Sequence, residues 1–363
     1  MEIIAYYLPQ YHPTKSNDKW WGKGFTEWTN VAKAKRLYPG HYQPKIPADL
    51  GFYDLRVPEV REQQAVLARE SGITAFCYYH YWFGNGHQEL ERPFNEVVEC
   101  GKPDFPFCLC WANETWYSKF WNRDGSVKKS VLAEQKYLGG EDNEKHFYCL
   151  LKAFKDKRYL KVGGKLLFVV YKPLDFEDFA EFKRQWNGLA KINGLPEFFF
   201  VGHCIYNNQI DEIIQMGFDG VNHCRRIDSM FIYDNLPVFI QNVRSYIKGK
   251  LKIPYIIRYS KAIKNCVQKE DYQKDVFPTM MPNWDHTPRS NSGGTVLHGA
   301  TPDLFFQHAK DILSVIKTKE VSRQIAFIKS WNEWGEGNYM EPDLRYGKGF
   351  IESLRKAIDL LQE

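Results

Sequence analysis

Short, almost continuous apolar segments alternate along the chain with longer amphipathic ones. The apolar segments have the length and composition of strands buried on both faces of a parallel sheet. They cover residues 3–8, 73–79, 105–111, 165–171, 198–203, 220–223, 276–281 and 325–331. The amphipathic segments predict helices at 58–70, 88–100, 142–156, 176–192, 207–216, 235–249, 302–317 and 348–362. Eight strands that alternate with helices predict an α/β chain folded as a (β/α)8 TIM barrel.

The chain is longer than such a barrel needs, which is typically about 250 residues. The surplus falls in 9–57, 112–141 and 224–275, and irregular loops of that length are usually functional. No linker or internal repeat divides the chain, so we predict a single barrel domain over residues 1–363 with long βα loops over its C-terminal face. The alternative, a doubly wound open sheet, would favour a G-x-G-x-x-G turn after the first strand. The sequence there is L-P-Q-Y-H.

Composition narrows the class of ligand. Aromatic residues make up 16% of the chain, which suits either a thick core or a sugar-stacking cleft. A net charge of +5 is too small to indicate nucleic acid as a partner.

The 8 cysteines include no C-x-x-C pair, which predicts free thiols and a cytoplasmic location. No stretch of 18 apolar residues occurs, so we expect no membrane span, and the N-terminus has no signal-peptide pattern.

Polar and aromatic residues recur where the predicted strands end. In a parallel barrel these ends meet at one face, and aromatic rings with a few carboxylates are typical of a carbohydrate cleft. Each such residue taken alone is more often structural, and it is the recurrence that favours a site. The residues that we expect to line one cleft are Gln10, Tyr11, Trp28, His80, Trp111, Asn113, Glu114, Tyr171, His203, His223 and Trp284.

The most informative segment is W-N-E-W-G-E-G at 331–337. Glu333 and Glu336 lie three residues apart on a glycine-containing turn, and we expect Trp331 and Asn332 beside them to line the cleft and bind the substrate. Two neighbouring carboxylates drive their pKa values apart, so that one can act as an acid and the other as a base, as glycosidic bond cleavage requires. A solvated surface turn is the simpler alternative. H-E-x-x-H, G-x-S-x-G and nucleotide-binding loops are absent, and we predict no metal or cofactor.

Five segments resemble the WbsX-like family of cell-surface polysaccharide biosynthesis proteins, which is similar in turn to the endo-α-mannosidases of glycoside hydrolase family ninety-nine. They are A-Y-Y-L-P-Q-Y-H at 5–12, W-W-G-K-G-F-T-E-W-T-N-V at 20–31, G-I-T-A-F-C-Y-Y-H-Y-W-F at 72–83, C-W-A-N-E-T-W at 110–116, and 331–337 with Glu341 and Pro342. The resemblance covers nearly the whole chain and also implies a (β/α)8 barrel.

The resemblance implies retaining chemistry on an α-linked, manno-configured sugar. By position, Glu333 would deprotonate the 2-hydroxyl of the sugar to form a 1,2-anhydro intermediate, and Glu336 would be the general acid/base. The segment at 20–30 resembles the biosynthetic branch, which leaves hydrolysis or transfer open, and the substrate could be an oligosaccharide or a lipid-linked glycan. One alternative is a glycosyltransferase with an activated sugar donor. Such enzymes commonly contain a D-x-D motif, and the nearest match in this chain is D-F-E-D at 175–178. A non-catalytic glycan-binding barrel would need no paired acids.

Overall fold

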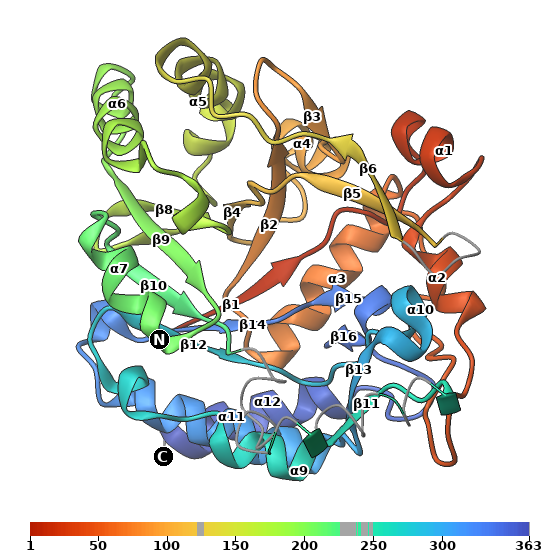
Figure 1. Ribbon diagram of the computed structural model, residues 1–363. Coiled ribbons are helices and arrows are strands. Elements are labelled where there is room, and N and C mark those ends of the chain that lie inside the picture. Colours follow the sequence, from red (N-terminus) through yellow and green to blue (C-terminus); the bar gives the residue numbers. More distant parts are fainter. Residues whose placement is uncertain (122–126, 226–236, 238, 241–245, 247–249, 363) are drawn as a thin grey trace.

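Eight parallel strands form a closed barrel at the centre of the computed structural model (Figure 1). The structure describes residues 1–121, 127–225, 237, 239–240, 246 and 250–362. The barrel strands are β1 (Glu2–Tyr7), β2 (Ala75–Trp82), β4 (Phe107–Trp111), β8 (Lys165–Val170), β9 (Phe198–Cys204), β10 (Gly220–His223), β12 (Val276–Met280) and β14 (Ile325–Ile328).

The strands follow one another around the barrel in chain order. β1 closes the ring because it pairs with β14 on one side, Glu2 opposite Ile325, and with β2 on the other, Ile4 opposite Ala75. All eight predicted strands are present, and their bounds differ from the predicted ones by at most two residues at the start and three at the end. The predicted (β/α)8 barrel is therefore confirmed.

Helices surround the strands in Figure 1 and cover their outer faces. They are α3 (Pro58–Ser71), α4 (Arg92–Cys100), α5 (Gly140–Phe154), α6 (Phe179–Ile192), α7 (Ile210–Gln215), α11 (Pro302–Lys317) and α12 (Gly349–Gln362). The predicted helix at 88–100 loses its first turn to a short strand, β3 (Gln88–Glu89), which pairs with β2. The helix predicted at 235–249 lies largely outside the described residues.

Alternate side chains of each strand point into the barrel and out toward the helices. Inside, the ring of Tyr6 stacks on Tyr79 at a centroid distance of 5.4 Å. Outside, the next residue, Tyr7, donates its hydroxyl hydrogen to Gln64 Oε1 of α3 over 2.7 Å. Both the inward-facing and the outward-facing side chains are mostly apolar, so each strand is an almost continuous hydrophobic segment of the sequence.

The long βα loops contain regular structure of their own. The loop after β1 carries α1 (Lys15–Trp21) and α2 (Glu27–Lys33), and the loop after β4 forms a hairpin of β5 (Trp116–Trp121) and β6 (Val127–Ala133). In Figure 1, α1, α2, the hairpin and α10 gather on the right of the barrel. The remaining short elements are β7 (Lys161–Val162), β11 (Tyr255–Arg258), α9 (Tyr259–Ala262), α10 (Thr287–Ser290), β13 (Thr295–His298), β15 (Asn332–Glu333) and β16 (Asn338–Tyr339).

All eight cysteines are free thiols, as the sequence predicts. Five of them, Cys77, Cys108, Cys110, Cys204 and Cys224, are buried in or beside the barrel strands, where a thiol packs as a small apolar group. Among the described residues, every helix is too short or too polar to cross a membrane.

Candidate active site

A cavity of about 660 Å³ lies at the carboxyl ends of the strands. Strand ends form its floor, and α1, α2, α10 and the β5–β6 hairpin form its walls. The floor is built from Gln10, Tyr79, Tyr81, Glu114, Tyr171, Lys329, Glu333 and Glu336, and the walls include Trp20, Glu27, Asn30, Trp116, His286 and Arg289. We call this space the acidic cavity, because Glu27, Glu114, Glu333 and Glu336 line it.

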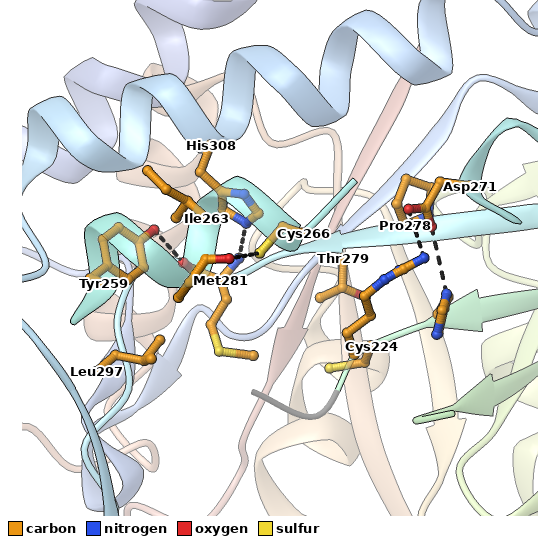
Figure 2. A pocket seen from close by; sticks show the side chains of 13 residues that line it. Cys224, Tyr259, Ile263, Cys266, Asp271, Pro278, Thr279, Met281, Leu297 and His308 are labelled. Carbon is orange, nitrogen blue, oxygen red and sulfur yellow. Dashed lines mark hydrogen bonds and ion pairs between the residues drawn. The ribbon is translucent and has the colours of Figure 1, made fainter. Parts of the chain in front are cut away.

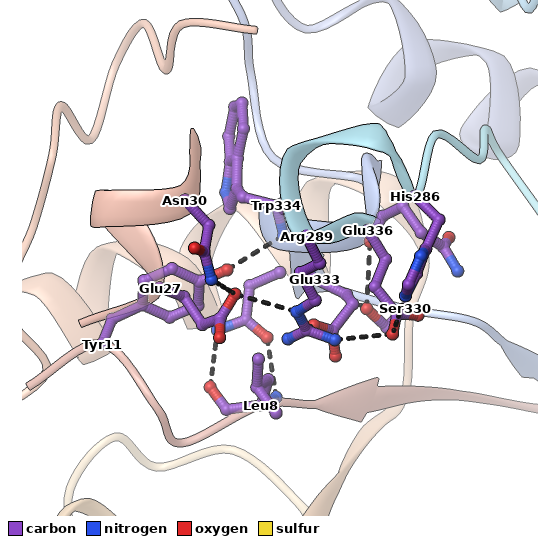
Figure 3. A network of polar contacts seen from close by, with 12 residues as sticks. Leu8, Tyr11, Glu27, Asn30, His286, Arg289, Ser330, Glu333, Trp334 and Glu336 are labelled. Carbon is purple, nitrogen blue, oxygen red and sulfur yellow. Dashed lines mark hydrogen bonds and ion pairs between the residues drawn. The ribbon is translucent and has the colours of Figure 1, made fainter. Parts of the chain in front are cut away.

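One guanidinium group binds three of these carboxylates (Figure 3). Arg289 donates from Nη2 to Glu333 Oε1 over 2.6 Å, and from Nη1 to Glu336 Oε1 over 2.5 Å. Its Nε donates to Glu27 Oε2 over 3.0 Å. Glu333 and Glu336 therefore face the same space, bridged by a single cation from another loop.

Burial and neighbouring charges divide the pKa values of the pair. Burial raises the pKa of Glu333 to about 8, and the carboxylates of Glu336 and Glu27 add to this effect against Arg289. Burial also opposes ionisation of Glu336, but Arg289, His286 and Lys329 outweigh it and lower its pKa to about 2. His286 Nε2 lies 3.6 Å from Glu336 Oε1. Near pH 7 the pair therefore holds one proton, on Glu333.

Backbone and side-chain bonds hold the turn that carries the pair. The amide of Asn332 binds both backbone groups of Leu8 at the end of β1, over 2.8 and 3.0 Å. The backbone N–H of Trp334 donates to the hydroxyl of Tyr11, and its indole N–H donates to Glu341 Oε2 over 2.6 Å. Burial raises the pKa of Glu341 to about 7, against the hydrogen bonds that it accepts.

Gly335 allows the close approach of α2 to this turn. A Cβ atom at position 335 would collide with the carboxylate of Glu27 and would stand 3.1 Å from Nε of Arg289. The glycine between the two catalytic candidates thus leaves room for the third carboxylate.

The structure brings together five of the side chains that the sequence singles out: Gln10, Glu114, Tyr171, Glu333 and Glu336 line the acidic cavity. Burial raises the pKa of Glu114, and Lys172 and Lys329 oppose this. Two more, His203 and Trp284, line an adjoining cavity of about 340 Å³ that shares His286 and Lys329 with the first.

Four further predicted residues lie behind the cavity wall and support it. Trp28 packs on Tyr11 at a centroid distance of 4.5 Å and donates its indole N–H to the carbonyl of Tyr53. Asn113 joins the ends of β4 and β8 through both backbone groups of Lys172. Tyr11 and Asn332 hold the turn as described above. We had expected all four at the cleft surface, but their polar atoms are turned to the backbone instead.

The remaining predicted residues lie on the outer side of the barrel, which corrects the expectation that they line the cleft. His80 Nε2 lies 2.8 Å from His146 Nε2 of α5, and Trp111 stacks on Phe182 of α6. Trp331 is fully buried against Phe76. His80 and Trp111 are one residue out of phase with the inward-facing positions, so the strand pleat turns them toward the helices, whereas Trp331 lies beyond the end of β14.

His223 also lies away from the cleft. It lines a separate small pocket between the barrel and α11, around Asp271 (Figure 2). Its Nδ1 is 3.6 Å from Asp271 Oδ1. Burial lowers the pKa of His223, so the imidazole is neutral near pH 7.

Sequence reasoning missed several cavity residues. Tyr79 and Tyr81 are the inward neighbours of His80, and Lys329 directly follows β14, the last barrel strand. Glu27 stands inside the segment F-T-E-W-T-N, where the carboxylate three residues before Asn30 was the available signal. Arg289 lies within the short helix α10 (Thr287–Ser290), whose sequence has no distinctive pattern, so nothing local marks it.

These features define the class: a (β/α)8-barrel protein with paired carboxylates on the turn after its last strand. The chain belongs to the WbsX family, whose model, described as "Glycosyltransferase WbsX", matches residues 3–354. The protein WxcX from Xanthomonas campestris pv. campestris, described as uncharacterized, is 32% identical over 359 residues. That match covers 98% of the chain but 49% of WxcX, so the chain spans about half the length of this relative.

Two solved structures share the fold. The family ninety-nine endo-α-mannosidase from Bacteroides thetaiotaomicron superposes with a TM-score of 0.56 at 13% identity, covering 99% of this chain and 97% of the other. A glycoside hydrolase-like protein superposes with a TM-score of 0.60 at 13% identity, covering 98% and 93%. At this identity the likeness supports the barrel architecture.

Proposed function

We propose that the protein is a carbohydrate-active enzyme that cleaves or transfers an α-linked, manno-configured sugar with retention of configuration. The observation that carries this proposal is the pair Glu333 and Glu336, bridged by Arg289 on the floor of a cavity walled by Trp20 and Trp116. Aromatic faces stack on sugar rings, and one protonated and one ionised carboxylate supply the acid and the base of glycosyl transfer.

The family resemblance supplies the proposed roles of the two acids. Following the family resemblance, Glu333 removes the proton from the 2-hydroxyl, and that oxygen attacks the anomeric carbon to give a 1,2-anhydro sugar. Glu336 protonates the departing oxygen and then activates the incoming water or sugar hydroxyl. In the unliganded chain the proton rests on Glu333, so this sequence of steps requires that it pass to Glu336 when the sugar binds. The opposite assignment, Glu333 as the acid, agrees with the unliganded electrostatics.

Substrates with different leaving groups decide between these assignments. We expect Glu336→Gln to slow cleavage of an unactivated α-mannoside by about 10²–10⁴-fold while sparing an aryl mannoside whose leaving group needs no proton. Glu333→Gln should slow both substrates, because the 2-hydroxyl must lose its proton in either case. The reverse pattern would make Glu333 the acid. Full activity of both variants would refute the proposed function.

A glycosyltransferase with an activated donor is the second candidate, and the description of the family favours it. Incubation with α-linked oligosaccharides, and separately with nucleotide-linked or lipid-linked sugars, shows which class is consumed. We place the reaction in bacterial cell-surface polysaccharide metabolism. We also propose a cytoplasmic location, which the eight free thiols support.

A further inference from the structure

The cavity that adjoins the acidic cavity has the opposite charge. Its volume is about 340 Å³, and His203, Arg225, Trp284, His286 and Lys329 are among its lining residues. No carboxylate of the described residues lines it, whereas four line its neighbour. We call it the cationic cavity. His286 and Lys329 form the wall that the two cavities share.

Lys329 is a charged group without a bonded partner. No hydrogen bond or ion pair to its ammonium group occurs among the described residues, and it lies 5.9 Å from the ring centre of Tyr171 and 5.8 Å from that of Trp284. Burial opposes its charge, but the surroundings, including Glu336 and Glu333, keep its pKa above the ordinary value. Lys329 is half-buried, a cation held partly out of water without hydrogen bonds is costly, and an oxyanion of a ligand would reduce that cost.

Two other groups of the cationic cavity have unused hydrogen-bonding capacity. His203 is 4% exposed, and its Nε2 has no hydrogen-bond partner among the described residues. The imidazole is stacked on Tyr171 at 4.6 Å, and burial lowers its pKa, so the ring is neutral. Arg225 donates from Nη2 to Asp271 over 2.9 Å, and its Nε and Nη1 have no partner in the part of the chain that the structure describes. Asp271 itself lines the small pocket on the far side of Arg225.

Trp284 supplies the flat apolar surface of this cavity. Its ring lies nearly parallel to that of His286, at 11° and a centroid distance of 6.2 Å. An aromatic face beside an unpaired ammonium group is suited to a sugar ring that carries a negative charge. A neutral sugar would leave the ammonium of Lys329 unpaired and more deeply buried.

We propose that the cationic cavity is a subsite for a sugar that carries an oxyanion, a carboxylate or a phosphate, next to the sugar that reacts at Glu333 and Glu336. The substrate is then an acidic glycan, and Lys329 is its specificity-determining residue. This inference rests on the proposed function for the identity of the reacting sugar, but its test does not require turnover.

Binding of three matched probes to the full chain tests the subsite. Mannose, mannuronic acid and mannose 6-phosphate are titrated by calorimetry at low and at high salt. We expect at least one charged probe to bind about tenfold more tightly than mannose, the size of one charge-assisted hydrogen bond. Added salt should reduce that difference. Tighter binding of only the phosphate or only the carboxylate identifies the group that the subsite accepts.

Lysine variants assign the preference to one side chain. Lys329→Met should abolish it and Lys329→Arg should retain it. Lys172→Met is the matched control, because Lys172 also lies over the Tyr171 ring, at 5.6 Å, but lines neither cavity. Thermal unfolding of each variant checks that it folds.

The inference is overturned if the charged probes bind no more tightly than mannose, or if none of the three binds. It is also overturned if Lys329→Met and Lys172→Met behave alike. The proposed function can fail separately: Glu333→Gln and Glu336→Gln should keep the charge preference while losing turnover. A charge preference in a chain that turns over no glycan would therefore contradict only the proposed function.

Discussion

Arg289 sets the charge balance of the candidate site. It contacts Glu27, Glu333 and Glu336, and Lys329 lies on the same floor. Three ionised carboxylates facing two cations would leave one negative charge in excess in a buried space. Burial is the main cause that raises the pKa of Glu333, and a proton there also removes that excess, while Arg289, His286 and Lys329 lower the pKa of Glu336.

Activity should follow the single proton that the pair shares. Above about pH 8 Glu333 ionises and the pair loses its proton, so kcat/KM should fall as pH rises through that value. On the acid side Glu336 stays ionised to about pH 2, so no acid limb from this pair is expected near neutrality. The measurement is a pH profile of kcat/KM. A rate that still rises above pH 9 would contradict a shared proton.

Removing the bridging cation should disable the pair without unfolding the chain. In Arg289→Met the two catalytic candidates and Glu27 lose their common partner, so the pKa of Glu336 should rise and kcat should fall by about 10²-fold. The acid limb of the pH profile should move toward neutrality. Arg184→Met, which removes an exposed arginine paired with Glu181, is the control and should change neither quantity.

At the scale of elements, the turn after β14 is a rigid platform. Glu341 accepts hydrogen bonds from Tyr53, Gln64 and the indole of Trp334, over 2.9, 2.6 and 2.6 Å, and so joins the turn to α3 and to the loop after β1. Ser330 adds a bond from the backbone N–H of Glu333 over 3.0 Å. These bonds fix the turn from which the carboxylates of Glu333 and Glu336 line the cavity.

Loss of Glu341 should therefore cost both stability and activity. Glu341→Ala leaves three buried donors without an acceptor, and we expect the free energy of unfolding to fall by about 2–4 kcal/mol. Urea unfolding monitored by tryptophan fluorescence measures this change. Glu320→Ala, at an exposed position, serves as the control. A change below about 0.5 kcal/mol would show that water replaces the lost acceptor.

A single methyl group should disturb the contact between α2 and the turn. Gly335→Ala places a Cβ against the carboxylate of Glu27 and close to Arg289. We expect reduced kcat with nearly unchanged secondary structure, because Glu27 must move and the hydrogen bonds of Arg289 are broken. Steady-state kinetics with circular dichroism checks both statements. Gly299→Ala is the matched case without a collision, because a Cβ at position 299 has no atom of the described residues within 4 Å. The positive φ of Gly299 adds local backbone strain in this variant.

At the scale of the molecule, barrel closure unites segments from both ends of the chain. β1 pairs with β14, and Glu27 meets Arg289 across 262 residues of sequence. The same core cluster extends from Ile3 to Ile358. A contribution from every strand to one buried interior favours cooperative unfolding.

We accordingly predict that residues 1–363 unfold as one domain. Heating should give one transition, with coincident midpoints in far-ultraviolet and near-ultraviolet circular dichroism. The cooperative unit should include the long loops, because α1, α2 and the β5–β6 hairpin share the acidic cavity with the barrel strands. Two separated transitions would mean that part of the chain folds independently.

The sequence by itself determined the strands, most helices and the catalytic candidates. Strands buried on both faces must be apolar throughout, so eight such segments are visible without a structure. Glu333 and Glu336 were recognisable because the signal is local, two carboxylates three residues apart on one turn. The family resemblance covered the same segments, and its motifs are long enough to be specific.

Only the tertiary structure decided which side chains face the cavity. A strand that is apolar on both faces hides its in-and-out alternation, so His80 could not be distinguished from Tyr79 and Tyr81. The partners of the catalytic candidates were equally hidden. Arg289 and Glu27 come from different loops, and no local pattern shows that they meet, because only closure of the barrel brings those loops together.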